Sequence, residues 1–314
     1  MESTLIVGVD RVVGANLAVS LSGLQPVSGV ALSGAVSADV CDHEVCGSTN
    51  AADAIAIAEQ IHPQRIVYAG VGSDSCWTEN PHADWCDALD SASAWLSAAE
   101  AVGAQFTLVS SDAVFTGPWM FHAENSQSVC NSPYATSLRE IERRVAERRP
   151  DSLIVRTNAF GWSPRGDADD LPWLESLIAR MQAGQRPRLD CLRHGSPLLA
   201  TDLAQIVCKA WRCGLTGVYH IAGAERVNPQ QFARRLAHQF ALPFAGDTEA
   251  ESLTDRVQGF GLGETSLQTR KVRRALGIGL PLVSEGIQRL YEQHLNGHRD
   301  RLRGRVAAAE ARVA

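Results

Sequence analysis

Short, mostly apolar runs alternate with amphipathic segments along the first half of the chain. The apolar runs predict strands at 4–8, 29–34, 65–70, 105–111 and 152–157. The segments between them place apolar residues at helical spacing and predict helices from Val13 onward and at 51–61, 88–103 and 135–149. Strands that lack a polar face and alternate with helices are typical of a parallel sheet that is buried on both faces.

The alternation becomes less regular after about residue 160. A polar loop with proline and glycine, GWSPRGDADDLP, precedes a helical pattern at 171–184. A further strand is expected at 217–223, and a helix at 228–240 with Asn228 as its N-cap. The end of the chain is helical in pattern, basic and rich in alanine. The sequence contains no repeat and no linker long enough to separate independent domains, so we expect one α/β fold.

Composition and charge narrow the class of protein. The chain has 314 residues, of which 45% are apolar and 20% charged, an ordinary globular balance. A net charge of -6 gives no electrostatic reason to expect binding to nucleic acid or to a membrane surface. No apolar run approaches the ~20 residues of a membrane-spanning helix. The first residues, MESTLIVGVD, have an acid and no basic cluster, so we expect a cytoplasmic protein without a signal peptide.

The eight cysteines form no CxxC pair and are expected to be reduced thiols. Cys41, His43 and Cys46 lie close together in the sequence. Their spacing matches no usual zinc pattern and a second pair of ligands is missing, so we predict that the protein has no metal site.

The turn after the first strand, GVDRVVGA, has part of a dinucleotide-binding pattern. Gly8 and Gly14 match the outer glycines of G-x-x-G-x-x-G, but Arg11 occupies the middle position. A large side chain obstructs close approach of a pyrophosphate, although a guanidinium can itself contact a phosphate or another anion. The alternative is a strand–helix turn that binds no ligand, and the sequence does not decide between the two.

The second strand lacks the acidic residue that usually contacts the adenosine ribose. The sequence after it reads SGAVSA, with no aspartate, glutamate or arginine. Asp39 and Asp42 follow further on, and we expect them to reach an adenine edge, if anything, rather than the ribose.

Six motifs together resemble a known family. They are VSSDAVFTG (109–117), NSPYATSL (131–138), RTNAFGW (156–162), ATDLA (200–204), GVYHIAG (217–223) and LQTRKVRRALGIGLP (267–281). In order and spacing they resemble the dTDP-4-dehydrorhamnose reductase group of extended short-chain dehydrogenases/reductases, over roughly residues 3–295.

The resemblance implies a Rossmann-type, doubly wound parallel sheet with a small C-terminal lobe that closes over a nucleotide-sugar. It divides the chain into a Rossmann domain at 1–160, to which 200–225 returns, a substrate lobe at 161–199 and 226–295, and a basic C-terminal helix at 296–314. The implied cofactor is NAD or NADP, whose binding the changed turn calls into question. The implied cofactor-binding residues are Gly8, Arg11, Val12, Gly14, Asp39, Ala69 and Gly70.

The family catalyses hydride transfer with a serine or threonine, a tyrosine and a lysine. By resemblance Ser111 and Tyr134 take the first two positions, but Leu138 stands where the lysine is expected. A phenol with a pKa of about 10 needs a nearby cation to act as an acid–base group at neutral pH. Arg139 lies about 100° further around the helix and is not expected to replace that charge.

Further positions depart from the family pattern. Ala113 stands where the family tends to have an aromatic residue, Gly261-Leu262 replaces an Arg-Pro pair, and Leu192-Arg193 replaces an Asp-Gln pair. The changes affect the cofactor turn, the catalytic lysine and substrate contacts together. We therefore interpret the chain as a divergent relative with an impaired catalytic site, a pseudoenzyme or a regulatory or binding subunit.

Two alternatives remain open. One is an active NAD(P)-dependent reductase or epimerase of a nucleotide-linked sugar that uses Ser111 and Tyr134. The other is a sensor that binds a nucleotide or sugar nucleotide. If the protein is not an enzyme, Ser111 caps the end of a strand and Tyr134 is a packed aromatic residue at the start of a helix. We also expect a homodimer through helices 88–103 and 135–149, by resemblance alone, and a protein partner is possible at the basic segment from 296 onward.

Overall fold

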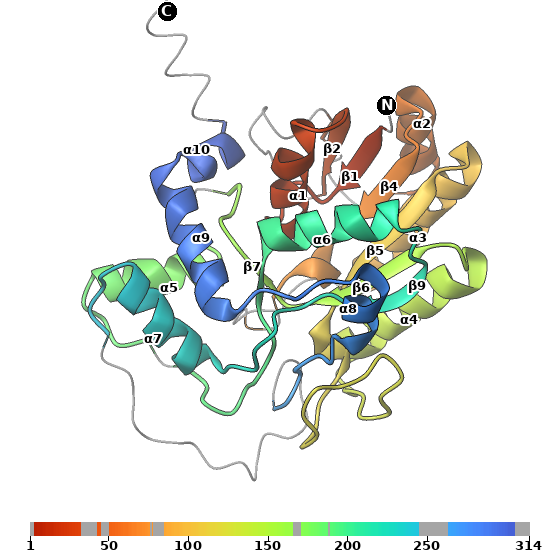
Figure 1. Ribbon diagram of the computed structural model, residues 1–314. Coiled ribbons are helices and arrows are strands. Elements are labelled where there is room, and N and C mark those ends of the chain that lie inside the picture. Colours follow the sequence, from red (N-terminus) through yellow and green to blue (C-terminus); the bar gives the residue numbers. More distant parts are fainter. Residues whose placement is uncertain are drawn as a thin grey trace, which may run out of the picture.

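The computed structural model describes residues 3–32, 43–44, 50–75, 77, 85–165, 171–187, 189–244 and 263–304. Within these residues, seven parallel strands form one sheet in the order β3-β2-β1-β4-β5-β6-β9 (Figure 1). The strands are β1 (Thr4–Val7), β2 (Val27–Ala31), β3 (His43–Glu44), β4 (Arg65–Tyr68), β5 (Gln105–Ser111), β6 (Leu153–Thr157) and β9 (Gly217–His220). The predicted Rossmann-type parallel sheet is confirmed.

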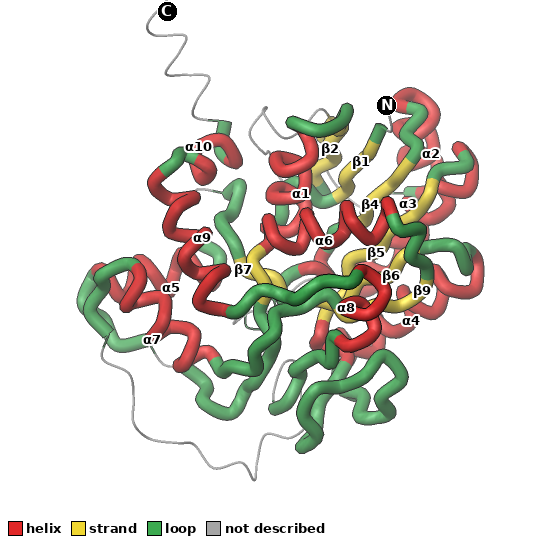
Figure 2. Tube along the Cα trace, in the orientation of Figure 1, coloured by secondary structure: helices red, strands yellow, loops and turns green. Residues whose placement is uncertain are grey.

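Helices cover both faces of this sheet (Figures 1 and 2). They are α1 (Val12–Ser22), α2 (Ala51–Ile61), α3 (Trp85–Val102), α4 (Pro133–Arg148) and α6 (Ala200–Arg212). Strand β1 shows why the apolar runs lack a polar face. Leu5 and Val7 belong to the hydrophobic cluster that contains residues of α2 and α3. Ile6, pointing the other way, belongs to the cluster of α1 and α6.

A smaller layer of structure lies beside the carboxyl ends of the strands. Its elements are a strand pair, β7 (Ala159–Phe160) with β8 (Leu198–Leu199), and the helices α5 (Trp173–Gln182), α7 (Pro229–Gln239) and α9 (Val283–Leu295). Helix α8 (Arg270–Leu276) lies instead beside the edge strand β9 of the main sheet. Buried aromatic residues hold much of this layer together: Phe160 meets Phe232 edge to face at a centroid distance of 5.0 Å. The strand pair was not predicted, because two-residue strands leave no periodic signal.

The C-terminal segment differs from the continuous helix expected at 296–314. Helix α9 ends at Leu295, Gly297 adopts a positive φ of 75°, and the short helix α10 covers only His298–Leu302. A left-handed glycine ends a helix because L-residues with a side chain rarely adopt that conformation. Residues 305–314 lie outside the described residues.

Basic side chains of this segment bind a carboxylate of the protein itself. Glu175, buried on α5, accepts hydrogen bonds from Arg299 at 2.7 Å, from Arg303 at 2.6 Å and from the main-chain N–H of Ser163 at 2.9 Å. Arg303 also donates to the carbonyl oxygen of Arg165 at 2.7 Å. Arg299 and Arg303 thus hold the end of the chain against its own fold, and neither guanidinium is free to meet a partner.

We predict that Arg303→Ala lowers the free energy of unfolding by about 1–3 kcal/mol, because Glu175 stays buried with fewer donors. The comparison variant is Arg301→Ala, which removes an exposed arginine from the same short helix and should change stability by less than about 0.5 kcal/mol. Urea unfolding of both variants measures the difference. Equal effects would show that the Glu175 contacts contribute nothing specific.

His298 joins α10 to the first helix of the sheet. Its Nε2 lies 2.9 Å from Oδ1 of Asn16, whose amide nitrogen donates to the carbonyl oxygens of Val12 and Trp162. With the Asn16 amide oriented in this way, His298 donates the hydrogen. Burial, assisted by the charge of Arg301, lowers the pKa of His298 to about 4.

This lowered pKa predicts that acid destabilises the fold. The unfolded chain takes up a proton at His298 near pH ~6.5 and the folded chain only near the lowered value, so stability present above ~6.5 is lost as the pH falls toward ~4. The expected loss from this histidine is on the order of 1–3 kcal/mol. His298→Gln keeps a donor for Asn16 but cannot titrate. Unfolding free energies measured across this range should therefore fall less steeply in the variant, and parallel curves would refute the assignment.

Candidate functional site

The site lies where the order of the strands reverses. From β1 the chain continues to β2 on one side and later returns to β4 on the other, so β1 and β4 flank the switch point. In open parallel sheets, ligands bind beyond the carboxyl ends of the strands at this point. A cavity of about 350 Å³ opens here. Its lining includes Asp10, Arg11, Asp74, Trp77, Trp173 and Arg180.

The structure brings together six of the residues predicted to bind a cofactor, all except Asp39. Gly8 has a φ of 94°, and a Cβ atom there would lie 2.2 Å from the carbonyl oxygen of Ala69, beside Gly70. A Cβ atom on Gly14 would lie 2.1 Å from the carbonyl oxygen of Gly8. The two glycines are therefore required for the close packing of the turn, α1 and the end of β4, whether or not a ligand binds. Val12 begins α1 and lines the cavity.

Arg11 fits this turn because its backbone needs no glycine. It is the N-cap of α1, with a φ of -114° and a ψ of 159°, an extended conformation open to any residue. Its guanidinium forms an ion pair with Asp74, which follows β4. Burial lowers the pKa of Arg11, but the carboxylates of Asp74 and Asp10 outweigh this and raise its pKa above the usual value. The charged Arg11 side chain thus crosses from the β1 side of the switch point to the β4 side.

Asp10 adds a second carboxylate to the same turn. It is buried, and it accepts hydrogen bonds from the main-chain N–H of Leu32 at 2.8 Å and from Arg165 at 2.9 Å. The pairing means that Arg165, like Arg11, is already neutralised by a neighbour. Sequence reasoning missed Asp10, although its place directly after a buried strand is a signal for a site residue. It also missed Arg165 and Asp74, whose partners are far away in the sequence.

Ser111 and Tyr134 are both enclosed in the protein. The Ser111 hydroxyl accepts the N–H of Ala113 at 3.1 Å and so caps a short 3-10 helix, Asp112–Val114, at the end of β5. Tyr134, only 4% exposed, directs its hydroxyl to the carbonyl oxygen of Val71 at 3.3 Å. These contacts are the ones expected of a strand cap and a packed aromatic residue.

Leu138 fills the position of the family lysine with an apolar contact. It is 3% exposed and belongs to the same hydrophobic cluster as Tyr134. It packs so closely on Gly72 that a Cβ atom there would lie 2.6 Å from a Leu138 methyl group. Arg139 turns away, toward the carbonyl oxygen of Cys130 and the hydroxyl of Thr136. Arg139 therefore does not supply the missing charge in this structure.

A buried polar network fixes the ends of β5 and β6. Asp112 accepts hydrogen bonds from Thr265 at 2.7 Å and from the Asn158 amide at 3.2 Å. The other end of the Asn158 amide accepts one from Ser75 at 2.8 Å. Buried polar groups with satisfied hydrogen bonds hold a single geometry. The network therefore makes this part of the site rigid.

The interior of the cavity offers an aromatic wall and a cation. Trp77 and Trp173 meet edge to face, with ring centroids 5.6 Å apart. The indole nitrogen of Trp77 is buried without a hydrogen-bond partner among the described residues. Arg180, which also lines the cavity, forms no ion pair within the described part of the chain. The arrangement suits a small, flat, anionic molecule.

Several predicted positions lie outside the described residues. They are Asp39, Asp42, Cys41, Cys46 and the pair at 261–262. Among the residues that are described, no group of three or more His, Cys, Asp or Glu side chains is arranged to hold a metal ion. No helix within the same residues is both long and apolar enough to cross a membrane.

Residues 2–295 match the model of a protein family described as the RmlD substrate binding domain. The chain belongs to this family. The predicted resemblance to dTDP-4-dehydrorhamnose reductases is thereby confirmed, and the match ends before α10.

Solved structures show that the family fold extends over almost the whole chain. A dTDP-4-dehydrorhamnose reductase from Bacillus anthracis in complex with NADP has a TM-score of 0.72 and 18% identity, with 93% of this chain and 99% of that one covered. The enzyme WbmH of Bordetella bronchiseptica in complex with NAD+ has a TM-score of 0.73 and 18% identity over the same shares. The UDP-glucose 4-epimerase of Thermotoga maritima, solved with UDP-glucose, has a TM-score of 0.73 and 15% identity, again over the same shares.

One curated relative is more similar in sequence over a shorter stretch. It is the probable low-salt glycan biosynthesis reductase Agl14 of Haloferax volcanii, 29% identical over 136 residues, which are 42% of this chain and 44% of that protein. The match spans less than half of the relative's length.

The glycine contacts lead to a stability prediction. Gly14→Ala should cost more than about 2 kcal/mol of unfolding free energy, because the new methyl group meets the Gly8 carbonyl oxygen, which the turn holds in place through the N–H of Arg11. Gly23→Ala, at the other end of α1, introduces the same methyl group where no atom lies within 4 Å and should be neutral within about 1 kcal/mol. Thermal or urea unfolding distinguishes the two. A neutral Gly14→Ala would mean that this glycine is not required for packing.

Proposed function

We propose that this RmlD-family protein does not transfer hydride and acts as a binding or regulatory protein. The observation that carries the proposal is the Arg11–Asp74 ion pair across the switch point. A dinucleotide pyrophosphate would have to lie against the turn that holds Arg11, and its negative charge would meet Asp10 and Asp74 there. NAD or NADP therefore does not fit the turn as the residues stand.

The enclosed tyrosine supports the same conclusion. The Tyr134 hydroxyl is engaged by the Val71 carbonyl oxygen, and the residue one turn later is the apolar Leu138. Proton donation by a phenol at neutral pH depends on a cation that lowers its pKa. The lysine that serves this purpose in the family has no counterpart at position 138.

The size of the cavity favours a ligand smaller than a dinucleotide. About 350 Å³ lies at the lower end of the range for small-molecule sites. Trp77 and Trp173 provide apolar surface, and Arg180 provides a positive charge that no described carboxylate pairs. We propose that this cavity holds a small anionic molecule with a flat apolar part. The expected location in the cytoplasm and the expected homodimer through α3 and α4 remain proposals.

One observation favours an active reductase or epimerase as a second candidate. Arg11 pairs with Asp74, whose main-chain N–H donates to the same Val71 carbonyl oxygen that accepts the Tyr134 hydroxyl, so the guanidinium and the phenol belong to one neighbourhood. Arg11 would then be the cation that assists Tyr134, in place of the lysine. This role requires Arg11 to be released from Asp74, which the ion pair opposes.

The proposal predicts that the native protein binds neither NADH nor NADPH at micromolar concentration. Replacing both members of the ion pair, Arg11→Gly with Asp74→Ala, should tighten binding of at least one cofactor by about tenfold or more, which is roughly 1.4 kcal/mol. Isothermal titration calorimetry measures both. The matched control removes the ion pair of the half-buried Arg149 with the exposed Asp151, neither of which lines the cavity, by Arg149→Gly with Asp151→Ala, and cofactor binding should not change.

Micromolar binding by the native chain would contradict the proposal. If Arg11→Gly alone then abolished cofactor oxidation with a 4-keto sugar nucleotide while binding persisted, the second candidate would be correct, because Arg11 would be assisting Tyr134.

A further inference from the structure

The loop that follows β5 presents three adjacent large apolar side chains to solvent. Trp119 is 70% exposed, Met120 60% and Phe121 42%. The other large apolar residues that are exposed, such as Leu24 and Leu295, stand singly in the sequence. Single exposed apolar residues are ordinary, but an exposed cluster with a tryptophan and a phenylalanine marks an interaction site.

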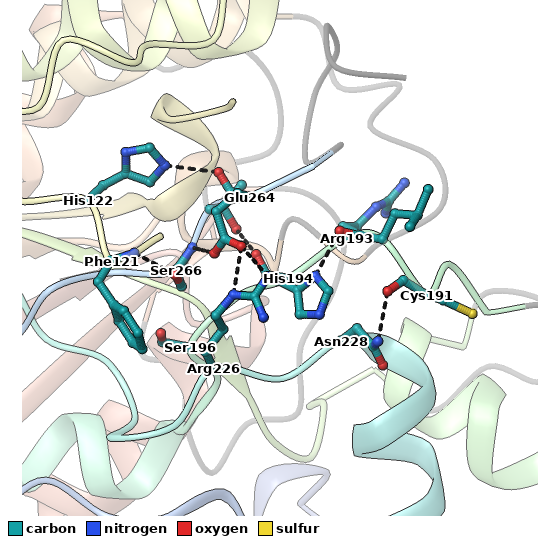
Figure 3. Close-up of polar contacts among 12 residues, drawn as sticks. Phe121, His122, Cys191, Arg193, His194, Ser196, Arg226, Asn228, Glu264 and Ser266 are labelled. Carbon is teal, nitrogen blue, oxygen red and sulfur yellow. Dashed lines mark hydrogen bonds and ion pairs between the residues drawn. The ribbon is translucent and has the colours of Figure 1, made fainter. Parts of the chain in front are cut away.

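The base of this loop is firmly held (Figure 3). The main-chain N–H of Phe121 donates to the Ser266 hydroxyl, and that of His122 to the Ser266 carbonyl oxygen, both at 2.8 Å. The His122 ring lies 3.0 Å from the Glu264 carbonyl oxygen and stacks on Phe115 at a centroid distance of 4.7 Å. Because its base is fixed, the loop loses little conformational entropy when a partner binds.

The supporting segment of the loop is residues 264–268, and Figure 3 also shows how it is held. Glu264 pairs with Arg226 at 2.6 Å and accepts the main-chain N–H of Ser266 at 3.1 Å. The Glu264 carboxylate therefore stabilises the supporting segment, and both of its contacts are made inside the protein.

The same supporting segment runs directly into α8, which is strongly basic. The N–H of Gln268 donates to the His122 carbonyl oxygen at 2.8 Å, and α8 begins two residues later. In Figure 1 the loop and α8 lie next to each other. The helix exposes four cationic side chains, those of Arg270, Lys271, Arg273 and Arg274.

None of these four cations forms an ion pair with a carboxylate of the described residues. Lys271 is oriented by the Val218 carbonyl oxygen at 2.6 Å and by the ring of Tyr219 at 4.0 Å. Arg270, Arg273 and Arg274 line a shallow hollow that is widely open to solvent. Positive charge is thus concentrated on one short helix of a chain whose net charge is -6.

We propose that the apolar loop 118–121 and helix α8 together form a docking surface for a partner protein whose recognition segment is acidic and carries an apolar anchor. The arginine-lined hollow takes the carboxylates, and the exposed loop covers the apolar residues. This surface shares no lining residue with the cavity at the switch point, and the inference does not depend on whether the protein transfers hydride there.

Charge and extent favour a protein segment over other polyanions. A nucleic acid or a bilayer presents negative charge over a broad area, which the acidic remainder of the chain would repel. The four cations here are confined to one helix of 7 residues. An acidic segment of limited length fits both the local charge and the small extent of this basic helix.

A labelled peptide tests this surface in the full-length protein. The probe is a fluorescein-labelled run of glutamates followed by leucine and phenylalanine, and fluorescence anisotropy measures its binding. We expect binding that weakens as salt rises to about 0.2 M. Arg273→Glu with Arg274→Glu should weaken it by about tenfold or more, as should Trp119→Ser.

Matched variants elsewhere on the protein show whether peptide binding requires this surface or only any exposed arginine or apolar residue. Arg234→Glu reverses an exposed arginine on α7, and Leu24→Ser removes a more exposed apolar residue. Neither should change the affinity by more than about twofold.

Four outcomes would overturn the proposal. The native protein does not bind the peptide at low salt, or the control variants weaken binding as much as the surface variants do. Phosphatidylserine vesicles or a DNA duplex compete for the surface more strongly than the peptide does. Sedimentation shows that the surface variants dissociate a dimer of this chain, which would assign the surface to self-association.

Discussion

The close contact between backbone segments at the switch point determines much of what surrounds it. The carbonyl oxygen of Gly8 lies against Gly14, and the turn itself lies against Ala69, with no room for a Cβ atom at either glycine. This contact seats α1 on the sheet and sets the distance between the ends of β1 and β4. A glycine pattern can therefore persist for packing alone, and Gly8 with Gly14 is not by itself evidence that a dinucleotide binds.

The positions that depart from the family pattern are those at which the fold tolerates a change. Arg11 has an extended backbone and a carboxylate within reach, so a large cation replaces glycine without strain. Leu138 faces the hydrophobic cluster around Tyr134, where an aliphatic side chain packs better than an ammonium group. Each replacement makes favourable contacts of its own. Both residues therefore contribute to the charge balance and the packing of the fold.

The sequence predicted the sheet well because its strands are apolar on both faces. Leu5 and Ile6, which are adjacent in β1, pack into the hydrophobic clusters on opposite faces of the sheet. It predicted the terminal helix poorly because Gly297 interrupts a segment whose composition is otherwise favourable to helix. It placed Ser111 and Tyr134 at the ends of the correct elements but could not show that both are enclosed. The ion pair between Arg11 and Asp74 joins residues 63 positions apart, and no local pattern reveals such a pairing.

The segment beyond the family match supports the wall of the cavity without lining it. Arg303 binds the carbonyl oxygen of Arg165, and the Arg165 side chain binds Asp10 beside the cofactor turn. Arg303 also shares Glu175 with Arg299. A chain of polar contacts therefore connects the C-terminal helix to the switch point. Because each arginine is already committed to a carboxylate, a phosphate entering the turn would have to displace an existing partner. Around the turn Arg11 pairs with Asp74 and Arg165 with Asp10, whereas Arg180, which also lines the cavity, forms no ion pair with a described residue.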